Sequence, residues 1–319
     1  MLKIFKNITA LSLLFSLSNV VFAEENLTPQ QLVNSMTQAQ EKLNYQISFV
    51  QTNAIDLQAF RYKHVKLDNK SYAQLTTLES GKQDIIRRDN LVSYFQTNFT
   101  PFTIQANHIV DYLPTILSAK IDKLAENYDF STLGRNRVAD RLVQVIKIMP
   151  KDDFRYQYVL FIDEETHLLL RSDLLDRTGN LLESFHVVNL YIGDEINGLA
   201  EQLNAIHFPP LLTDDSNKKL SITRWQTKWL PKGFTLVSEN TDPEDTDGNN
   251  IIESRLYSDG LFSFTIYVAD KIINENQDHL WQQGVNTIYS ENIGDKEVTL
   301  IGQIPSATAK RIVQDLQFK

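Results

Sequence analysis

The chain has 319 residues and no cysteine, and its formal net charge is −9. Without cysteine it cannot form disulfides, thiolate nucleophiles, cysteine-ligated zinc sites or iron–sulfur clusters. An acidic chain of this kind does not neutralise nucleic-acid phosphates, so we expect no nucleic-acid partner.

Residues 1–23 have the pattern of an export signal that is cleaved. Two lysines precede an apolar run over residues 8–17, and the small-x-small motif at 21–23 predicts cleavage between Ala23 and Glu24. A transmembrane helix needs about 20 apolar residues, so an uncleaved anchor fits this run less well. The predicted mature chain carries 29 basic and 40 acidic residues, since only two lysines leave with the signal.

The first part of the mature chain predicts one helix followed by antiparallel strands. Thr28 can cap a helix that reaches Leu43. Short strands follow, divided by turn signals such as the Asp-Asn pairs at 68–69 and 89–90, which is typical of a meander. Apolar residues spaced by three and four then predict a short amphipathic helix within 111–129.

Strands resume after this helix and include a hairpin around Thr178-Gly179-Asn180. Long antiparallel strands with few helices predict an α+β fold, in which a large curved sheet carries helices on one face.

A domain boundary is predicted where Pro209-Pro210 precedes a polar, non-periodic stretch. We therefore expect a large domain over 24–205, a linker over 206–219 and a small domain over 220–319. The small domain has strand patterns and closes with a helix from Ser306 to Leu316, which Ser306 can cap.

The stretch "YSDG" at 257–260 is the best candidate for hydrolase chemistry, because Ser258 and Asp259 lie together among apolar residues. No G-x-S-x-G elbow is present, however, and Asp-Gly is the preferred pair of a two-residue hairpin turn. We therefore interpret the stretch as a bend between two strands rather than as a catalytic site.

Other catalytic or metal-binding patterns are absent from the sequence. The six histidines stand singly without a chelating spacing, and no glycine-rich phosphate loop occurs. The acidic triplet at 163–165 follows a predicted strand, so a solvated turn is favoured over a pair of proton-transfer carboxylates. We predict no enzyme activity, no cofactor and no metal.

Two features could bind a ligand. Arg135 and Arg137, with Arg141 and Arg87-Arg88, could meet an anion or a partner's carboxylates, although local ion pairs are the simpler interpretation. Aromatic residues crowd the first half of the chain and could line an apolar cavity or form plain core. The aromatic candidates for a lipid site are Phe49, Tyr94, Phe95 and Phe102.

Eight strings occur in order along the mature chain: "FRYKHVKLDN", "DYLP", "YDFSTLGRNRVADR", "RSDLLDRTGNLLE", "PPLL", "WLPKGF", "IESRLYSDGLFSFTIYV" and "TAKRIVQDLQF". Together they resemble the MucB/RseB family of exported negative regulators of the envelope-stress sigma factor in Gram-negative bacteria. The resemblance covers both expected domains.

The resemblance implies a large domain with the half-open barrel of lipoprotein carriers, helices on its concave side, and a smaller sheet domain with a C-terminal helix. It implies a periplasmic protein that binds the periplasmic segment of a membrane-spanning anti-sigma factor and blocks its proteolysis. Lipopolysaccharide or acyl chains would loosen this complex. The resemblance implies no catalytic residues in this chain.

Site residues are predicted by position only. We expect the second domain to contact the partner through Arg255, Tyr257, Phe262 and Phe264. The first-domain aromatics, with Arg135 and Arg137, are expected to meet an acyl or anionic ligand.

Other classes of function remain open at this stage. A periplasmic lipid or lipoprotein carrier would use the first domain alone, and an exported hydrolase would depend on Ser258. A eukaryotic secreted protein is suggested only by the triplets "NLT" and "NFT". A homo-oligomer is compatible with the sequence.

Overall fold

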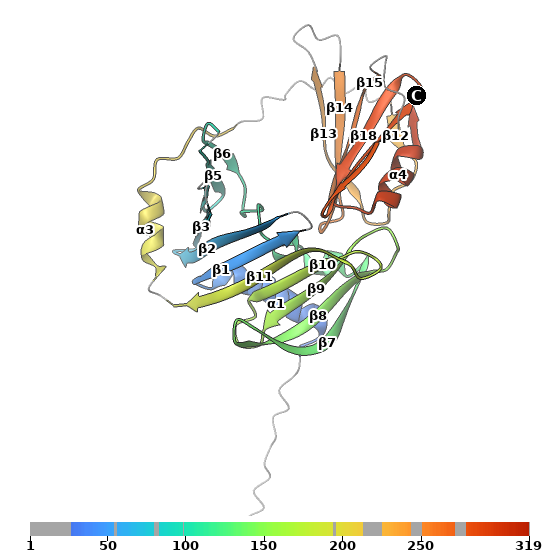
Figure 1. Cartoon of the computed structure of the whole chain (residues 1–319). Coiled ribbons are helices and arrows are strands. Elements are labelled where there is room, and N and C mark those ends of the chain that lie inside the picture. The colour runs from blue at the N-terminus through green and yellow to red at the C-terminus, as the bar shows by residue number, and fades with distance from the viewer. Residues whose placement is uncertain are drawn as a thin grey trace, which may run out of the picture.

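The computed structural model describes residues 27–53, 56–79, 83–97, 99–193, 196–212, 225–243, 251–271 and 279–318 (Figure 1). The expected signal with its cleavage site at Ala23 and Glu24 lies outside the described residues, as does the expected linker from residue 213 onward.

An antiparallel sheet of eleven strands forms the large domain, in the order β6-β5-β4-β3-β2-β1-β11-β10-β9-β8-β7. Its strands are β1 Tyr45–Asn53, β2 Leu57–Leu67, β3 Lys70–Thr77, β4 Asp84–Arg88, β5 Leu91–Phe95, β6 Phe102–Gln105, β7 Tyr128–Val138, β8 Arg141–Pro150, β9 Gln157–Asp163, β10 Leu169–Leu175 and β11 Leu181–Ile192. The sheet curves, so that β5 and β6 stand steeply against the strands around β11 (Figure 1).

The small domain has six strands in the order β13-β14-β15-β18-β17-β16, and a two-stranded sheet pairs β12 with β19. Its elements are β12 Trp225–Thr227, β13 Thr235–Pro243, β14 Ile251–Ser258, β15 Ser263–Asp270, β16 His279–Gln283, β17 Asn286–Ile293, β18 Lys296–Gly302, α4 Ser306–Gln314 and β19 Leu316–Phe318. The large curved sheet and the smaller sheet with its C-terminal helix confirm the predicted fold class.

The first helix, α1 (Pro29–Lys42), forms where the sequence predicts it. Thr28 caps it in a capping box, in which its hydroxyl accepts from the Gln31 amide and the Gln31 side chain accepts from the Thr28 amide. Leu32, Val33 and Met36 are buried on one side of the helix. They pack against the concave face of the large sheet and so close the core there.

The large sheet presents different residues to its two faces because side chains alternate along a strand. On β4, for example, Ile85 joins the main core, whereas Ile86 joins a second cluster on the opposite face. The helix α3 (Gly198–Asn204) covers this second cluster through Leu199 and Leu203. The expectation that all helices of the large domain lie on the concave side is therefore wrong for α3.

The helix expected within 111–129 is split into a short 3-10 helix, η1 (Thr115–Ser118), and one turn of α-helix, α2 (Ile121–Leu124). Pro114 occupies the N-cap of η1, and the backbone of Ala119 is extended, so the two pieces cannot fuse. Ser306 is likewise the first residue of α4 and not its cap, because Pro305 occupies that position.

Apart from the cluster under α3, the buried apolar residues of both domains form one continuous cluster. The small sheet meets the large one beside β9 and β10, where the ring of Tyr158 stacks on that of Phe262 at a centroid distance of 5.8 Å (Figure 1). The two domains therefore share a single core across their boundary.

Candidate functional site

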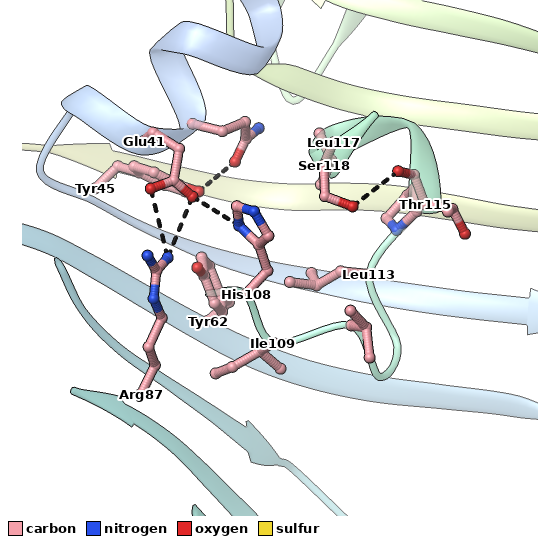
Figure 2. A pocket seen from close by; sticks show the side chains of 13 residues that line it. Glu41, Tyr45, Tyr62, Arg87, His108, Ile109, Leu113, Thr115, Leu117 and Ser118 are labelled. Carbon is pink, nitrogen blue, oxygen red and sulfur yellow. Dashed lines mark hydrogen bonds and ion pairs between the residues drawn. The ribbon is translucent and has the colours of Figure 1, made fainter. Parts of the chain in front are cut away.

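A pocket lies on the concave side of the large sheet, between the end of α1 and residues 106–118, which we call the covering segment. Its lining residues come from α1, β1, β2, β4 and the covering segment: Gln40, Glu41, Tyr45, Tyr62, Arg87, His108, Ile109, Val110, Leu113, Pro114, Thr115, Leu117 and Ser118 (Figure 2). One side of the pocket is thus polar, and the covering segment makes the other side largely apolar.

Three charged or titratable side chains meet at the polar side of this pocket. Glu41 Oε1 lies 3.2 Å from Arg87 Nη1 and 3.0 Å from His108 Nδ1 (Figure 2). Burial alone would raise the pKa of Glu41, but the hydrogen bond from His108 and the charge of Arg87 outweigh it and lower the pKa to about 2. The carboxylate is therefore ionised at neutral pH and ties the covering segment to α1.

The floor beneath this cluster is made of buried polar rings. Tyr45 and Tyr62 lie with ring centroids 5.9 Å apart, and the hydroxyl of Tyr45 donates to Gln40. His64 Nδ1 lies 2.8 Å from the carbonyl oxygen of Leu43, and burial lowers the pKa of this histidine. A neutral His64 therefore donates from Nδ1 at neutral pH.

The covering segment is held at three further places. Tyr94 donates to Asp111 Oδ2 at 2.7 Å, the hydroxyl of Tyr112 donates to Gln83 at 3.2 Å, and the ring of Tyr112 lies 4.5 Å from that of Phe60. The cavity left beneath it is about 60 Å³, the space of one or two water molecules. An acyl chain could enter only if the covering segment moved.

The contact between the domains centres on a buried ion pair. Arg155, in the loop between β8 and β9, has its Nε 3.0 Å from Asp259 Oδ2, and the two side chains are 1% and 0% exposed. Tyr128 donates to the same oxygen at 2.5 Å, while Asp259 Oδ1 accepts from the amides of Leu261 and Phe262. Every lone-pair region of the carboxylate thus faces a donor or a cation.

The same loop supplies further contacts to the small domain. Arg155 donates to the Lys232 carbonyl oxygen and pairs with Asp152 at 3.1 Å. The carbonyl oxygen of Phe154 accepts from Thr308, and its ring meets that of Trp229 edge-on at 4.8 Å. The loop between β8 and β9 therefore inserts into the small domain, and we call it the plug loop.

Three of the four predicted partner residues are buried in the core that the two domains share. Tyr257, Phe262 and Phe264 are between 1% and 5% exposed and belong to the shared core. Arg255 is partly exposed, lies 4.2 Å from the Trp225 ring centroid and donates to the Trp225 carbonyl oxygen. The three aromatic residues are buried in this arrangement of the domains, because an apolar strand pattern does not tell core from surface, and their contact with a partner stays a prediction.

The predicted lipid-site residues divide into three groups. Tyr94 and Phe102 stack at 4.8 Å on the concave side of the sheet, half-buried beside the covering segment. Phe49 is 1% exposed and packs between Phe60 and Phe185 as core. The structure thus brings only Tyr94 and Phe102 together at an accessible position on the concave face.

The remaining three candidates lie elsewhere. Phe95 belongs to the cluster under α3, on the opposite face of the sheet. On the β7 side, Arg135 Nε lies 2.7 Å from Glu164 and Arg137 lies 3.8 Å from Asp140. The two arginines therefore form local ion pairs, and their role toward an anion stays a prediction.

Two expected turns are more constrained than the sequence suggests. The bend after Ser258 is a four-residue loop rather than a two-residue turn, closed by the pairing of Ser258 with Ser263, with Gly260 at φ +92°. Asp163, expected in a solvated turn, is 1% exposed and accepts two hydrogen bonds from Arg141. Asp259 of the first loop and Asp163 of the second are each paired with an arginine that is distant in the sequence, Arg155 and Arg141.

Within the described residues, no group of three or more His, Asp or Glu side chains could hold a metal ion. Nor does this part of the chain contain a helix with the length and apolar character needed to cross a membrane.

The sequence and fold match known proteins along the whole described chain. The models of the MucB/RseB N-terminal domain and the MucB/RseB C-terminal domain match residues 28–212 and 219–317. The sigma-E factor regulatory protein RseB of Haemophilus influenzae is 51% identical over 319 residues, which is 100% of both chains. RseB of Escherichia coli K12 is 37% identical over 309 residues, covering 96% of this chain and 95% of that one.

A solved structure of MucB in complex with MucA(peri) has a TM-score of 0.71 at 24% identity and covers 92% of this chain and 99% of that chain. At this identity the likeness establishes a shared fold for both sheets.

We expect the Glu41 cluster to make stability depend on pH. Because the pKa of Glu41 falls from 4.5 to about 2 on folding, its contribution is complete above about pH 5 and is lost as the pH falls toward 2. E41Q should lower the free energy of unfolding at pH 7 by about 1 kcal/mol, since solvent screens a pair that is one-third exposed. Between pH 7 and pH 3, the free energy of unfolding of E41Q, measured with urea, should depend less steeply on pH than that of wild type. An unchanged pH dependence would contradict this role, and E201Q on α3 is the control.

We expect D259N to weaken the domain interface by about 3 kcal/mol, because it leaves Arg155 buried without its main counter-charge. Denaturant unfolding gives the loss of stability, and small-angle scattering reports separation of the domains. D270N is the control, since Asp270 forms an exposed pair with Lys296 and should cost less than about 1 kcal/mol. Equal losses in the two variants would show that the buried pair does not hold the domains together.

Proposed function

The chain belongs to the MucB/RseB family, and from this premise we propose that it binds the periplasmic segment of a membrane-spanning anti-sigma factor. The observation that carries the proposal is the 51% identity to a sigma-E factor regulatory protein over the whole length of both chains. The related fold of MucB, solved with MucA(peri), supports a binding role for this architecture.

By covering the anti-sigma segment, the protein would protect it from regulated proteolysis and so repress the envelope-stress sigma factor. The export signal pattern of residues 1–23 supports action in the periplasm. In this proposal the protein acts only by binding and releasing its partner.

Release would be triggered by lipopolysaccharide or another lipid whose acyl chain enters the concave side of the large domain. The half-buried Tyr94–Phe102 stack and the apolar side chains of the covering segment offer contacts to such a chain. Because the cavity is only about 60 Å³, entry would require the covering segment to leave Glu41 and Tyr94. Lipid binding would therefore change the conformation of the large domain.

The coupling needed is small. A tenfold loss of partner affinity corresponds to about 1.4 kcal/mol of coupling between the lipid site and the partner site. The displacement of a few hydrogen bonds on the covering segment is enough to supply such a difference.

Calorimetric titration of residues 24–319 with the anti-sigma factor's periplasmic segment tests the function. We expect saturable binding that weakens at least tenfold when lipopolysaccharide is added, and slower cleavage of the bound segment by the protease that cuts it. Folded protein that binds nothing in either condition would overturn the proposal. Delivery of lipid between vesicles would then favour a carrier.

F102D should separate the two activities. A charge on the concave face would disfavour an acyl chain, so lipopolysaccharide should lose most of its effect on partner affinity while binding without lipid stays within about twofold of wild type. V188D, at an exposed position of β11, is the control. A full lipopolysaccharide effect in F102D would place the lipid elsewhere.

A further inference from the structure

We propose that β6 passes the displacement of the covering segment to residues 209–212, which we call the linker root, through hydrogen bonds centred on Thr103. This inference rests on the proposed function and specifies how a lipid in the large domain acts on the arrangement of the two domains. Thr103 touches neither the lipid nor the partner in this proposal, so it is a positioning residue.

Three hydrogen bonds, which we call the Thr103 clamp, hold the linker root on β6. The Thr103 amide donates to the Pro210 carbonyl oxygen at 3.0 Å, and the Leu212 amide donates to the Thr103 carbonyl oxygen at 2.7 Å. The Thr103 hydroxyl donates to the Pro209 carbonyl oxygen at 2.8 Å. Thr103 and Leu211 pair as residues of parallel strands do, so residues 210–212 cover the outer edge of β6 (Figure 1).

Neighbouring residues of β6 serve the two faces of the sheet. The ring of Phe102 stacks on that of Tyr94 on the concave face, and Tyr94 donates to Asp111 of the covering segment. Thr103 points to the opposite face, because side chains alternate along a strand. The apolar contact offered to an acyl chain and the clamp on the linker root therefore belong to consecutive residues.

The same division recurs on β4, two strands away. Arg87 faces the concave pocket and pairs with Glu41. Arg88, the next residue, lies with its guanidinium carbon 3.4 Å from the Phe208 ring centroid and donates to the Ile206 carbonyl oxygen at 3.3 Å. This end of the sheet therefore holds the covering segment on one face and the chain that leads to the linker root on the other.

The covering segment is also the direct continuation of β6. The strand ends at Gln105, and the amide of Ala106, the first residue of the covering segment, donates to the Asn90 carbonyl oxygen at 3.0 Å. Because the cavity beneath the segment is only about 60 Å³, an acyl chain enters only if the segment moves. That movement would pull on β6 at a point two residues beyond Thr103.

β6 is well placed to yield to such a pull. It has four residues and pairs with β5 on one side, and the linker root is its neighbour on the other side. Short strands at the edge of a sheet open locally at a lower free energy than central strands do. Opening of the clamp would release the linker root, so the small domain could change its orientation on the large one.

The other end of the covering segment offers a second route to the domain boundary. Its last residue, Ser118, lines a cleft of about 590 Å³ between the two domains, beside Asp259 and Gly260. The two routes differ in what they require, because only the route through β6 depends on the Thr103 clamp.

Hydrogen exchange of the 24–319 protein, with and without lipopolysaccharide, tests the clamp in the absence of the partner. Lipopolysaccharide should speed exchange of the Thr103 and Leu212 amides roughly tenfold or more, because these two amides donate the backbone bonds of the clamp. The amides of β18 in the small sheet should change by less than about twofold. Unchanged exchange at Thr103 and Leu212 in protein that binds the lipid would overturn the inference.

Two substitutions at position 103 test the hydroxyl. T103V keeps the shape of the side chain but removes its bonds to Pro209 and Ser93, so without lipid the Leu212 amide should exchange roughly fivefold faster than in wild type. T103S keeps a hydroxyl and should stay within about twofold of wild type. Equal exchange in the two variants would remove the hydroxyl from the clamp.

A disulfide lock shows whether the clamp carries the effect of the lipid. The chain has no cysteine, and residues paired on adjacent strands lie within the reach of a disulfide, so T103C/L211C can be closed by oxidation. The oxidised protein should bind lipopolysaccharide like wild type, but the lipid should weaken its affinity for the anti-sigma factor's periplasmic segment less than about twofold instead of tenfold. Reduction should restore the lipid effect.

The matched control is Q46C/K63C, which joins paired residues of β1 and β2 away from β6 and should keep the full lipid effect when oxidised. A full lipid effect in oxidised T103C/L211C would overturn the inference in favour of the route through Ser118, and the proposed function would stand. Wild-type protein that binds no segment would overturn the proposed function, whereas the exchange experiment would still decide on the clamp. Protein that binds no lipopolysaccharide would overturn the lipid trigger and this inference together.

Discussion

The relative placement of the two domains depends on one buried ion pair, between Arg155 and Asp259. Each charge costs several kcal/mol to remove from water, so neither residue can be buried without the other. Arg155 belongs to the plug loop of the large domain and Asp259 to a hairpin of the small domain, and Tyr128 completes the carboxylate's coordination. The pair contributes little net stability by itself, but loss of Asp259 alone would leave Arg155 buried with Asp152 as its remaining counter-charge.

The interface and the concave pocket are linked by the covering segment. At one end it is held to α1 through His108 and Glu41, and at the other its last residue reaches the cleft beside Asp259. In a well-packed protein small shifts tend to switch contacts rather than spread evenly. A ligand that lifts this segment would therefore change the surroundings of the domain boundary without touching the small domain.

Local sequence signals predicted the local structure well. The Thr28 capping box and the turn at 68–69 need only neighbouring residues, and both appear where the pattern indicates. The general architecture followed from strand spacing. What failed depended on contacts distant in the sequence. Asp259 looked like an ordinary turn residue because Arg155, its counter-charge, lies more than one hundred positions earlier.

The same limit applies to the candidate site. Tyr257 and Phe264 would carry the same strand pattern whether they faced solvent or, as they do, a buried core. Glu41, Arg87 and His108 come from a helix, a strand and a loop, and no spacing rule connects them. Only Tyr94 and Phe102, which face each other across neighbouring strands, came together as the crowding of aromatic residues suggested.

The cover that residues 210–212 form on β6 also sets the length of the tether between the domains. Because Leu212 is fixed to Thr103, covalent geometry alone limits the distance from Leu212 to Trp225 to about 45 Å. Two domains held this closely have an effective concentration in the millimolar range. Separation of the domains at the ion pair would therefore be a reversible, intramolecular event. The two domains would dock again without the help of a second molecule.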